Sequence, residues 1–193
     1  MTDVPRETSK LIAQFKLLVI EENQRQNLVS PKSIDEFDVR HLDDAAQLVA
    51  LGKPGNWADI GSGAGLPGLV IAVLTGAPMT LIEPRRLRAD FLRRAIAELG
   101  VDATVSEAKA QNVTGRFDNI TARAVAELDK LFAMAEHLAH PGTRWILPKG
   151  RSAKKELEAA QQSWHGRFTL VPSRTSDEAM ILVAEDVRRR GKR

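Results

Sequence analysis

The sequence predicts an α/β fold with a doubly wound, seven-stranded sheet and an N-terminal helical cap. From Trp57 onward, short apolar runs alternate with helical stretches, which is the pattern of βαβ units in a parallel sheet. Before that point, apolar residues such as Leu11, Phe15 and Leu18 recur at helical spacing. We therefore expect a helical cap over residues 1–52, a sheet domain over 53–187 and a basic tail over 188–193 that is disordered or held by an anionic partner.

The cap is predicted to contain two helices. A turn at Ser30 and Pro31 separates them, and Ser33 and Glu36 have the spacing of a capping box for the second helix, which runs to about Leu51. No internal repeat or low-complexity segment interrupts the chain.

The strands and helices of the sheet domain follow in alternation. The predicted strands are Trp57–Ile60, Met79–Ile82, Ala103–Ser106, Asp118–Thr121, Arg144–Leu147, Phe168–Val171 and Met180–Ala184. The predicted helices lie near Leu66–Leu74, Arg85–Leu99, Ala126–Leu138 and Lys154–Gln162.

The composition excludes several classes of protein. The chain has 43% hydrophobic and 27% charged residues, as globular domains do. It has no cysteine and four histidines, so we expect no disulfide and no structural metal. Gln14 and Lys16 interrupt the most apolar early stretch. We therefore expect neither a signal peptide nor a membrane span, and a cytoplasmic protein.

A glycine-rich loop follows the first predicted strand, and it fits two cofactor patterns. Residues 59–68 read D-I-G-S-G-A-G-L-P-G. Gly63, Gly65 and Gly68 match the dinucleotide pattern G-x-G-x-x-G. Asp59 with Gly61, Gly63 and Gly65 matches the methyltransferase pattern D/E-x-G-x-G-x-G. Pro67 suits the first turn of the next helix.

The residues outside the loop favour S-adenosylmethionine over NAD. Glu83 closes the second predicted strand, where a carboxylate can accept hydrogen bonds from the ribose of either cofactor. A small nicotinamide enzyme of the short-chain type needs a tyrosine, and this chain has none. A glycine-rich turn without a ligand remains the third interpretation.

Several motifs together resemble RsmG, also called GidB, the bacterial family that methylates guanine N7 in 16S ribosomal RNA. The similar segments are the loop at 59–68, T-A-R-A-V-A at 121–126, L-P-K-G at 147–150, N-L-V at 27–29 and R-H-L-D-D at 40–44. Their order and spacing hold over residues 20–160, so the joint resemblance is more specific than any one motif. It implies the class I S-adenosylmethionine methyltransferase fold, which is Rossmann-like.

The resemblance also implies a cofactor site. Gly61, Gly63 and Leu66 would line the S-adenosylmethionine pocket, and Glu83 would meet the ribose. The adenine would meet Ala110 and Gln111, and the methionine part would meet Arg123. Gln111 stands where the family has an acidic residue, and Ala45 replaces its serine.

The expected chemistry needs few catalytic groups. Guanine N7 offers a lone pair and carries no proton, so orientation and charge stabilisation should suffice. The candidate catalytic residues are Arg123, His41 and Lys149. A structural role stays open for His41, and a solvated lysine stays open for Lys149.

Clusters of basic residues favour an RNA partner, with a net charge of +3 as weaker support. The clusters are Arg85, Arg86, Arg88, Arg93 and Arg94, then Lys149, Arg151, Lys154 and Lys155, then the tail. The expected partner is 16S ribosomal RNA, free or in a small-subunit particle. The alternatives are methylation of another RNA site or of a small molecule, and an RNA-binding protein without catalysis.

Overall fold

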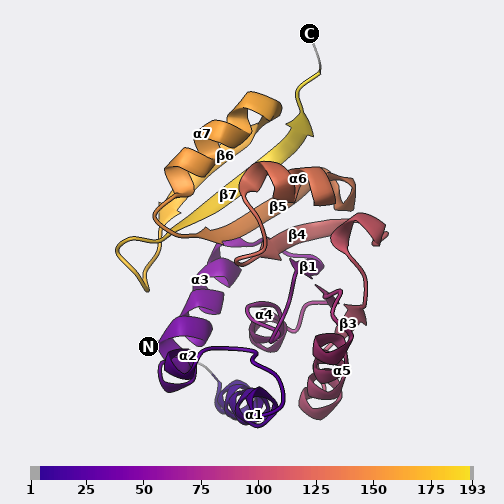
Figure 1. The fold of residues 1–193 in the computed structure, drawn as a ribbon, viewed down its shortest axis with the longest axis vertical. Helices are drawn as coiled ribbons and strands as arrows, with labels where there is room; N and C mark the ends of the chain where they lie inside the picture. The colour runs from indigo at the N-terminus through magenta and orange to yellow at the C-terminus, as the bar shows by residue number, and fades with distance from the viewer. Residues whose placement is uncertain (1–4, 192–193) are drawn as a thin grey trace.

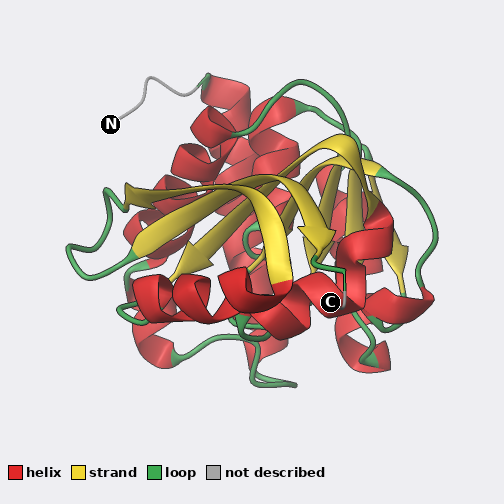
Figure 2. Cartoon of the chain, turned by 90° about the horizontal axis from the view of Figure 1, so that it is seen from above, coloured by secondary structure: helices red, strands yellow, loops and turns green. Residues whose placement is uncertain are grey.

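The computed structural model describes residues 5–191, which form a central sheet with helices on both faces (Figure 1, Figure 2). The seven strands are β1 (Trp57–Ile60), β2 (Met79–Ile82), β3 (Ala103–Ser106), β4 (Phe117–Ala122), β5 (Ala139–Lys149), β6 (Trp164–Pro172) and β7 (Met180–Arg189). The predicted α/β fold is confirmed. The first three strands have the predicted bounds, whereas the last four are longer.

The strand order places a ligand crevice at the middle of the sheet. The order is β3-β2-β1-β4-β5-β7-β6, and β1 pairs in parallel with both β2 and β4. Strand β7 runs antiparallel to β5 and β6. Because the chain returns from β3 at the edge to β4 beside β1, the helices on either side diverge there. Ligands of doubly wound sheets bind outside the carboxyl ends of the strands at such a point.

Helices cover both faces of the sheet. They are α1 (Arg6–Asn23), α2 (Pro31–Asp35), the π-helix η1 (Asp38–Asp43), α3 (Asp44–Leu51), α4 (Gly68–Thr75), α5 (Arg86–Leu99), the 3₁₀ turn η2 (Ala110–Asn112), α6 (Leu128–Ala135), the 3₁₀ turn η3 (Glu136–Leu138) and α7 (Ala153–Ser163). Buried residues of α1, α3, α4 and α5 form one apolar core. Those of α6 and α7 form the other core, where the Phe132 ring centre lies 5.2 Å from that of Trp145.

Two predicted helix starts are wrong. Ser30 caps α2, because its side chain accepts a hydrogen bond from the Ser33 amide, so Ser33 does not open a capping box with Glu36. Pro31 is the first residue of α2 rather than part of a turn. Similarly, Pro67 precedes α4, which begins at Gly68. The local signals, a serine with a proline before α2 and a proline alone before α4, were present, but the predicted register was wrong by one to three residues.

The second cap helix is not one continuous α-helix. A short α2 leads into the π-helix η1, which continues into α3 at Asp44. A π-helix accommodates an extra residue per turn and often marks a functional site. This turn carries His41 into the protein interior, where its ring packs edge-on against Phe37 with centres 5.0 Å apart.

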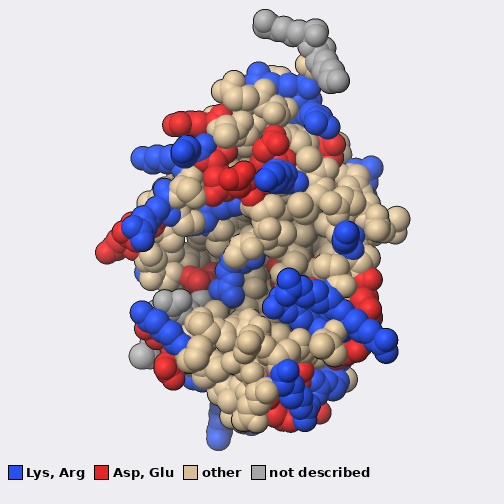
Figure 3. Space-filling model, in the orientation of Figure 1, with Lys and Arg blue, Asp and Glu red and all other residues tan. Residues whose placement is uncertain are grey.

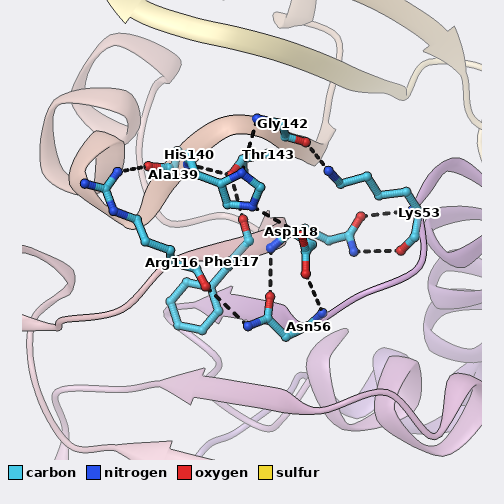
Figure 4. Close-up of polar contacts among 10 residues, drawn as sticks. Lys53, Asn56, Arg116, Phe117, Asp118, Ala139, His140, Gly142 and Thr143 are labelled. Carbon is cyan, nitrogen blue, oxygen red and sulfur yellow. Dashed lines mark hydrogen bonds and ion pairs between the residues drawn. The ribbon is translucent and has the colours of Figure 1, made fainter.

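A network of hydrogen bonds fixes the amino edge of the sheet (Figure 4). The Asn56 amide donates to Asp118 Oδ2 at 3.0 Å, and the Asp118 amide donates to Asn56 Oδ1 at 2.8 Å. Asp118 Oδ1 also lies 3.2 Å from His140 Nε2. The starts of β1, β4 and β5 are therefore tied together, at the edge opposite the crevice.

Strand pairing corrects the predicted disordered tail. Arg188 and Arg189 belong to β7 and lie opposite His165 and Trp164 of β6. The Arg190 amide donates to the Ser163 carbonyl at 2.8 Å. The sheet thus extends beyond Val187, and the remaining predicted tail residues 192–193 lie outside the described residues.

Candidate functional site

A cavity of about 630 Å³ opens at the carboxyl ends of β1, β2 and β4. Every residue predicted to bind the cofactor lines it: Gly61, Gly63, Leu66, Glu83, Ala110, Gln111 and Arg123. Its size is within the range of small-molecule sites. Figure 3 shows a hollow near the centre of one face, and Lys and Arg side chains gather beside it, next to where Figure 1 draws α5.

The glycine loop forms one wall because its backbone is left-handed at three places. The φ angles are +69° at Gly61, +56° at Gly63 and +81° at Gly65. A Cβ on Gly61 would lie 2.6 Å from Val125 Cγ2, so the loop packs closely on the segment after β4. A Cβ on Gly63 would meet nothing nearer than Arg88 at 3.6 Å. Glycine is thus required at 61 by space and conformation, and at 63 by conformation.

Glu83 holds the loop as well as lining the cavity. Its Oε2 accepts a hydrogen bond from the Gly63 amide, and its Oε1 accepts one from the Arg85 amide, both at 2.9 Å. The side chain is 3% exposed. Each carboxylate oxygen can accept a second bond. Glu83 can therefore shape the loop and still accept hydrogen bonds from ribose hydroxyls.

Asp59 lies beneath the loop and does not line the cavity. Its Oδ2 accepts a hydrogen bond from the Gly68 amide at 3.1 Å, at the start of α4. Its Oδ1 is buried and has no hydrogen-bond partner among the described residues. Burial raises the pKa of Asp59 to about 7, although the Gly68 amide and Arg123 act in the opposite direction. The aspartate of the motif is thus a support for the loop.

Arg123 joins the cavity to the helical cap. Its Nη1 lies 3.1 Å from His41 Nδ1 and 3.9 Å from Asp44 Oδ2. A guanidinium only donates hydrogen bonds, so His41 Nδ1 must accept and its proton must be on Nε2. His41 is 4% exposed and does not line the cavity. The structure therefore places His41 behind Arg123, where it can position that side chain.

Lys149 lies apart from the cofactor-sized cavity. Its Nζ donates to the Ala126 carbonyl and to Glu156 Oε2, both at 2.9 Å. Its side chain is 10% exposed, so it is not a solvated lysine. It lines a second cavity, which shares Arg123, Ala124 and Val125 with the first.

Other residues that line the cavity were not predicted to bind the cofactor, among them Leu28, Val29, Arg85, Arg88 and Lys109. Asn23 Oδ1 accepts hydrogen bonds from the amides of Leu28 and Val29 at 2.8 and 3.0 Å, which folds their loop over the site. The N-L-V motif at 27–29 was a usable signal for the first two. Arg85 and Arg88 were visible only as members of a basic cluster, and Lys109 belonged to none of the predicted clusters.

Ion pairs divide the basic cluster of α5. The paired arginines are Arg86 with Asp90, Arg93 with Asp90 and Glu107, and Arg94 with Glu22. Within the described part of the chain, no ion pair engages Arg85, Arg88 or Lys109. The available positive charge is therefore concentrated at the mouth of the cavity, rather than along the whole helix.

Among the side chains that the structure describes within residues 5–191, no group of three histidine, aspartate or glutamate residues could hold a metal ion. No helix in the same range is long and apolar enough to cross a membrane.

Comparison with known proteins identifies relatives along most of the chain. The model of the family GidB, described as rRNA small subunit methyltransferase G, matches residues 8–174. The ribosomal RNA small subunit methyltransferase G of Rhizorhabdus wittichii is 44% identical, over 98% of this chain and 90% of that protein. The protein of the same name from Sphingopyxis alaskensis is 45% identical, over 89% of this chain and 76% of its own length.

Solved structures share the fold at low sequence identity. The glycopeptide N-methyltransferase MtfA, in complex with S-adenosyl-L-methionine, has a TM-score of 0.63 and 13% identity, over 75% of this chain and 86% of its own. The ribosomal protein L11 methylase of Lactobacillus delbrueckii has a TM-score of 0.59 and 19% identity, over 76% of this chain and 79% of its own. The sheet and its crevice are thus those of class I methyltransferases.

Proposed function

This chain belongs to the GidB family, rRNA small subunit methyltransferase G, and from that premise we propose that it methylates N7 of one guanine in 16S ribosomal RNA. The methyl donor is S-adenosylmethionine. The observation that carries the proposal is that the glycine loop, Glu83 and Arg123 line one cavity at the switch point of the sheet.

The residues of the cavity match the parts of S-adenosylmethionine. Glu83 offers carboxylate oxygens to the ribose hydroxyls, and Arg123 offers a cation to the methionine carboxylate. The η2 turn brings Ala110, which is buried, and Gln111, which is exposed, to the same wall. Gln111 can hydrogen-bond to an adenine edge without carrying a charge.

The reaction at N7 asks little of the protein beyond position and electrostatics. Bound S-adenosylmethionine supplies an electrophilic methyl group; the N7 lone pair forms the new bond, and the bonding electrons remain on sulfur. No proton is transferred, so no general base is needed. This agrees with His41 lying behind Arg123 instead of in the cavity. The task of the chain is to hold the base against the donor.

RNA is the substrate that the charge around the cavity favours. Arg85, Arg88 and Lys109 surround the opening, and cations placed there can contact the phosphates next to a target nucleotide. A substrate in the small ribosomal subunit also places the reaction in the cytoplasm.

Transfer of labelled methyl groups tests the proposal. Small-subunit RNA and small-subunit particles that lack native methylation are incubated with the protein and labelled S-adenosylmethionine, and the product is mapped. We expect a single N7-methylguanine in 16S ribosomal RNA. Labelling of another atom or another RNA would overturn the N7 assignment, and binding of S-adenosylmethionine without RNA labelling would overturn the substrate.

A further inference from the structure

A second cavity, of about 520 Å³, lies beside the first and shares Arg123, Ala124 and Val125 with it. We propose that this cavity receives the target guanine, and that Lys149 and Glu127 read its base-pairing edge. This inference rests on the proposed function. Both cavities are lined by the segment that follows β4, residues 123–125, so a base in one would be next to a methyl donor in the other.

The segment between the cavities is held in an unusual conformation. Ala124 has a φ of +56°, which is uncommon for a residue with a Cβ and is found at functional sites. Val125 contacts the glycine loop at Gly61 and is 38% exposed. Val125 and Pro148 also line the second cavity, with Ala126 and Ala179. These apolar side chains offer surfaces against which a planar base can pack.

Lys149 is placed to donate to guanine O6. An ammonium group has three N–H donors, and the Ala126 carbonyl and Glu156 accept two of them. The remaining donor belongs to a side chain that lines the cavity and is 10% exposed. Hydrogen bonds from Ser152 and Lys149 outweigh burial and lower the pKa of Glu156, so this carboxylate stays charged and the ammonium is balanced.

Glu127 is placed to accept from guanine N1–H and the exocyclic amine. This residue lines the cavity and is exposed, and no hydrogen bond or ion pair to another described side chain engages its carboxylate. It stands at the N-cap position of α6 without capping it. Adenine presents an amine where guanine has O6, and an acceptor where guanine has N1–H. Lys149 and Glu127 would therefore repel adenine and bind guanine.

The carboxylate of Glu127 also suits the product. When the N7 lone pair takes the methyl group, the sulfur keeps the electrons of the broken bond and the base gains a positive charge. Glu156 is paired with Lys149, whereas the Glu127 charge is not balanced by an ion pair to a described side chain. Glu127 lines the cavity in which the positive charge develops, so it favours the transition state over the neutral base.

Inosine at the target position isolates the contact to Glu127, because inosine lacks only the exocyclic amine. We expect the native protein to lose about 10-fold in kcat/KM when inosine replaces the target guanosine, as for loss of a hydrogen bond to a charged group. In Glu127→Ala the same replacement should change kcat/KM less than about 2-fold. RNA affinity can also be measured with S-adenosylhomocysteine in place of the donor. The ratio of the affinity for guanosine RNA to that for inosine RNA should fall in Glu127→Ala, as the ratio of kcat/KM values does.

The control is Glu158→Ala, which removes an exposed carboxylate from α7 outside both cavities and should keep the native preference. Lys149 is left intact, because its removal would leave Glu156 without its cation. An unchanged preference in Glu127→Ala, with N7-methylguanine still formed, would overturn the base-reading role and leave the proposed function standing. If the native protein forms no N7-methylguanine, both are overturned.

Discussion

At the scale of single residues, three charged side chains of the site, those of Asp59, Glu83 and Arg123, differ in what they contact. Asp59 touches the backbone beneath the glycine loop. Glu83 touches the loop and also lines the cavity. Arg123 lines the cavity and contacts the cap. Substitutions should therefore affect stability at Asp59, and both cofactor binding and turnover at Arg123. A substitution at Gly63, in the loop that Glu83 holds, should affect cofactor binding.

Asp59→Asn should reduce the dependence of stability on pH. The pKa of Asp59 is raised to about 7 by burial, so between about pH 4 and pH 7 the folded state holds a proton that the unfolded state has lost. The free energy of unfolding therefore falls as the pH rises through this window, by up to about 4 kcal/mol.

Urea unfolding of both proteins from pH 4 to pH 8 measures this difference. Asparagine is neutral throughout and can still accept from the Gly68 amide, so the variant should gain on the native protein as the pH rises. Exposed Asp102→Asn serves as the control and should follow the native profile. A constant difference between Asp59→Asn and the native protein across this range would contradict the raised pKa.

Gly63→Asp should abolish binding of S-adenosylmethionine. The new carboxylate would enter a cavity wall beside Glu83, and the residue would be strained at a φ of +56°. Gly76→Asp is a matched control, because Gly76 has a φ of +64° with nothing within 4 Å and lies at the end of α4. Calorimetry should show binding of S-adenosylmethionine only for the Gly76 variant. Equal binding by both variants would show that the loop is not part of the cofactor site.

Arg123→Ala should weaken both cofactor binding and turnover, by about 10-fold each, because the proposed charge-assisted contact to the methionine carboxylate would be lost. Arg144→Ala is the control. The two side chains are exposed to the same degree, at 29% and 31%, and Arg144 pairs with Glu185 away from the cavity. Kinetics that fall equally in both variants would indicate a structural role for Arg123.

At the scale of elements, a polar network connects the cap to the turn between β6 and β7. Gln47 of α3 is 5% exposed. Its Nε2 donates to Asp44 at 3.1 Å and to Ser173 at 3.2 Å, and its Oε1 accepts from the Arg174 amide at 2.9 Å. Asp44 in turn lies 3.9 Å from Arg123. The cap is therefore joined to the sheet domain by the same residues that support the site.

Gln47→Leu should lower the free energy of unfolding by about 1–3 kcal/mol, because buried partners lose their hydrogen bonds. Exposed Gln161→Leu on α7 is the control and should stay within about 0.5 kcal/mol of the native protein. Urea denaturation measures both values. A native-like stability in Gln47→Leu would show that water replaces the network.

At the scale of the whole molecule, RNA affinity should depend on the basic residues at the cavity mouth. Replacing Arg85, Arg88 and Lys109 by alanine should reduce the slope of log K against log salt by about 2–3, if each contacts one phosphate. Arg167→Ala removes an exposed arginine that pairs with Glu185 and Asp186 on the far strands, and it should leave the slope unchanged. Filter binding across salt concentrations measures the slope for each variant and for the native protein. Equal slopes in all three would show that the RNA does not bind at the basic residues of the cavity mouth.

The local sequence was sufficient for the fold class and the first three strands, and the family resemblance supplied seven of the residues that line the cofactor-sized cavity. Strands β1 to β3 have apolar runs that end at glycine, proline or charged residues, so adjacent residues in the chain determine where each strand ends. The loop glycines carry their own conformational requirement. These features depend on residues that are adjacent in the chain, so they can be predicted from the sequence.

Only the tertiary structure decided the rest. Strands β5 to β7 continue through polar residues because partner strands complete their hydrogen bonds. The partners of Lys149, Arg123 and Asp44 come from other elements, so no spacing along the chain reveals them. Pairing between distant side chains depends on how the elements pack, and it determined which basic residues remain at the cavity and which stabilise the fold.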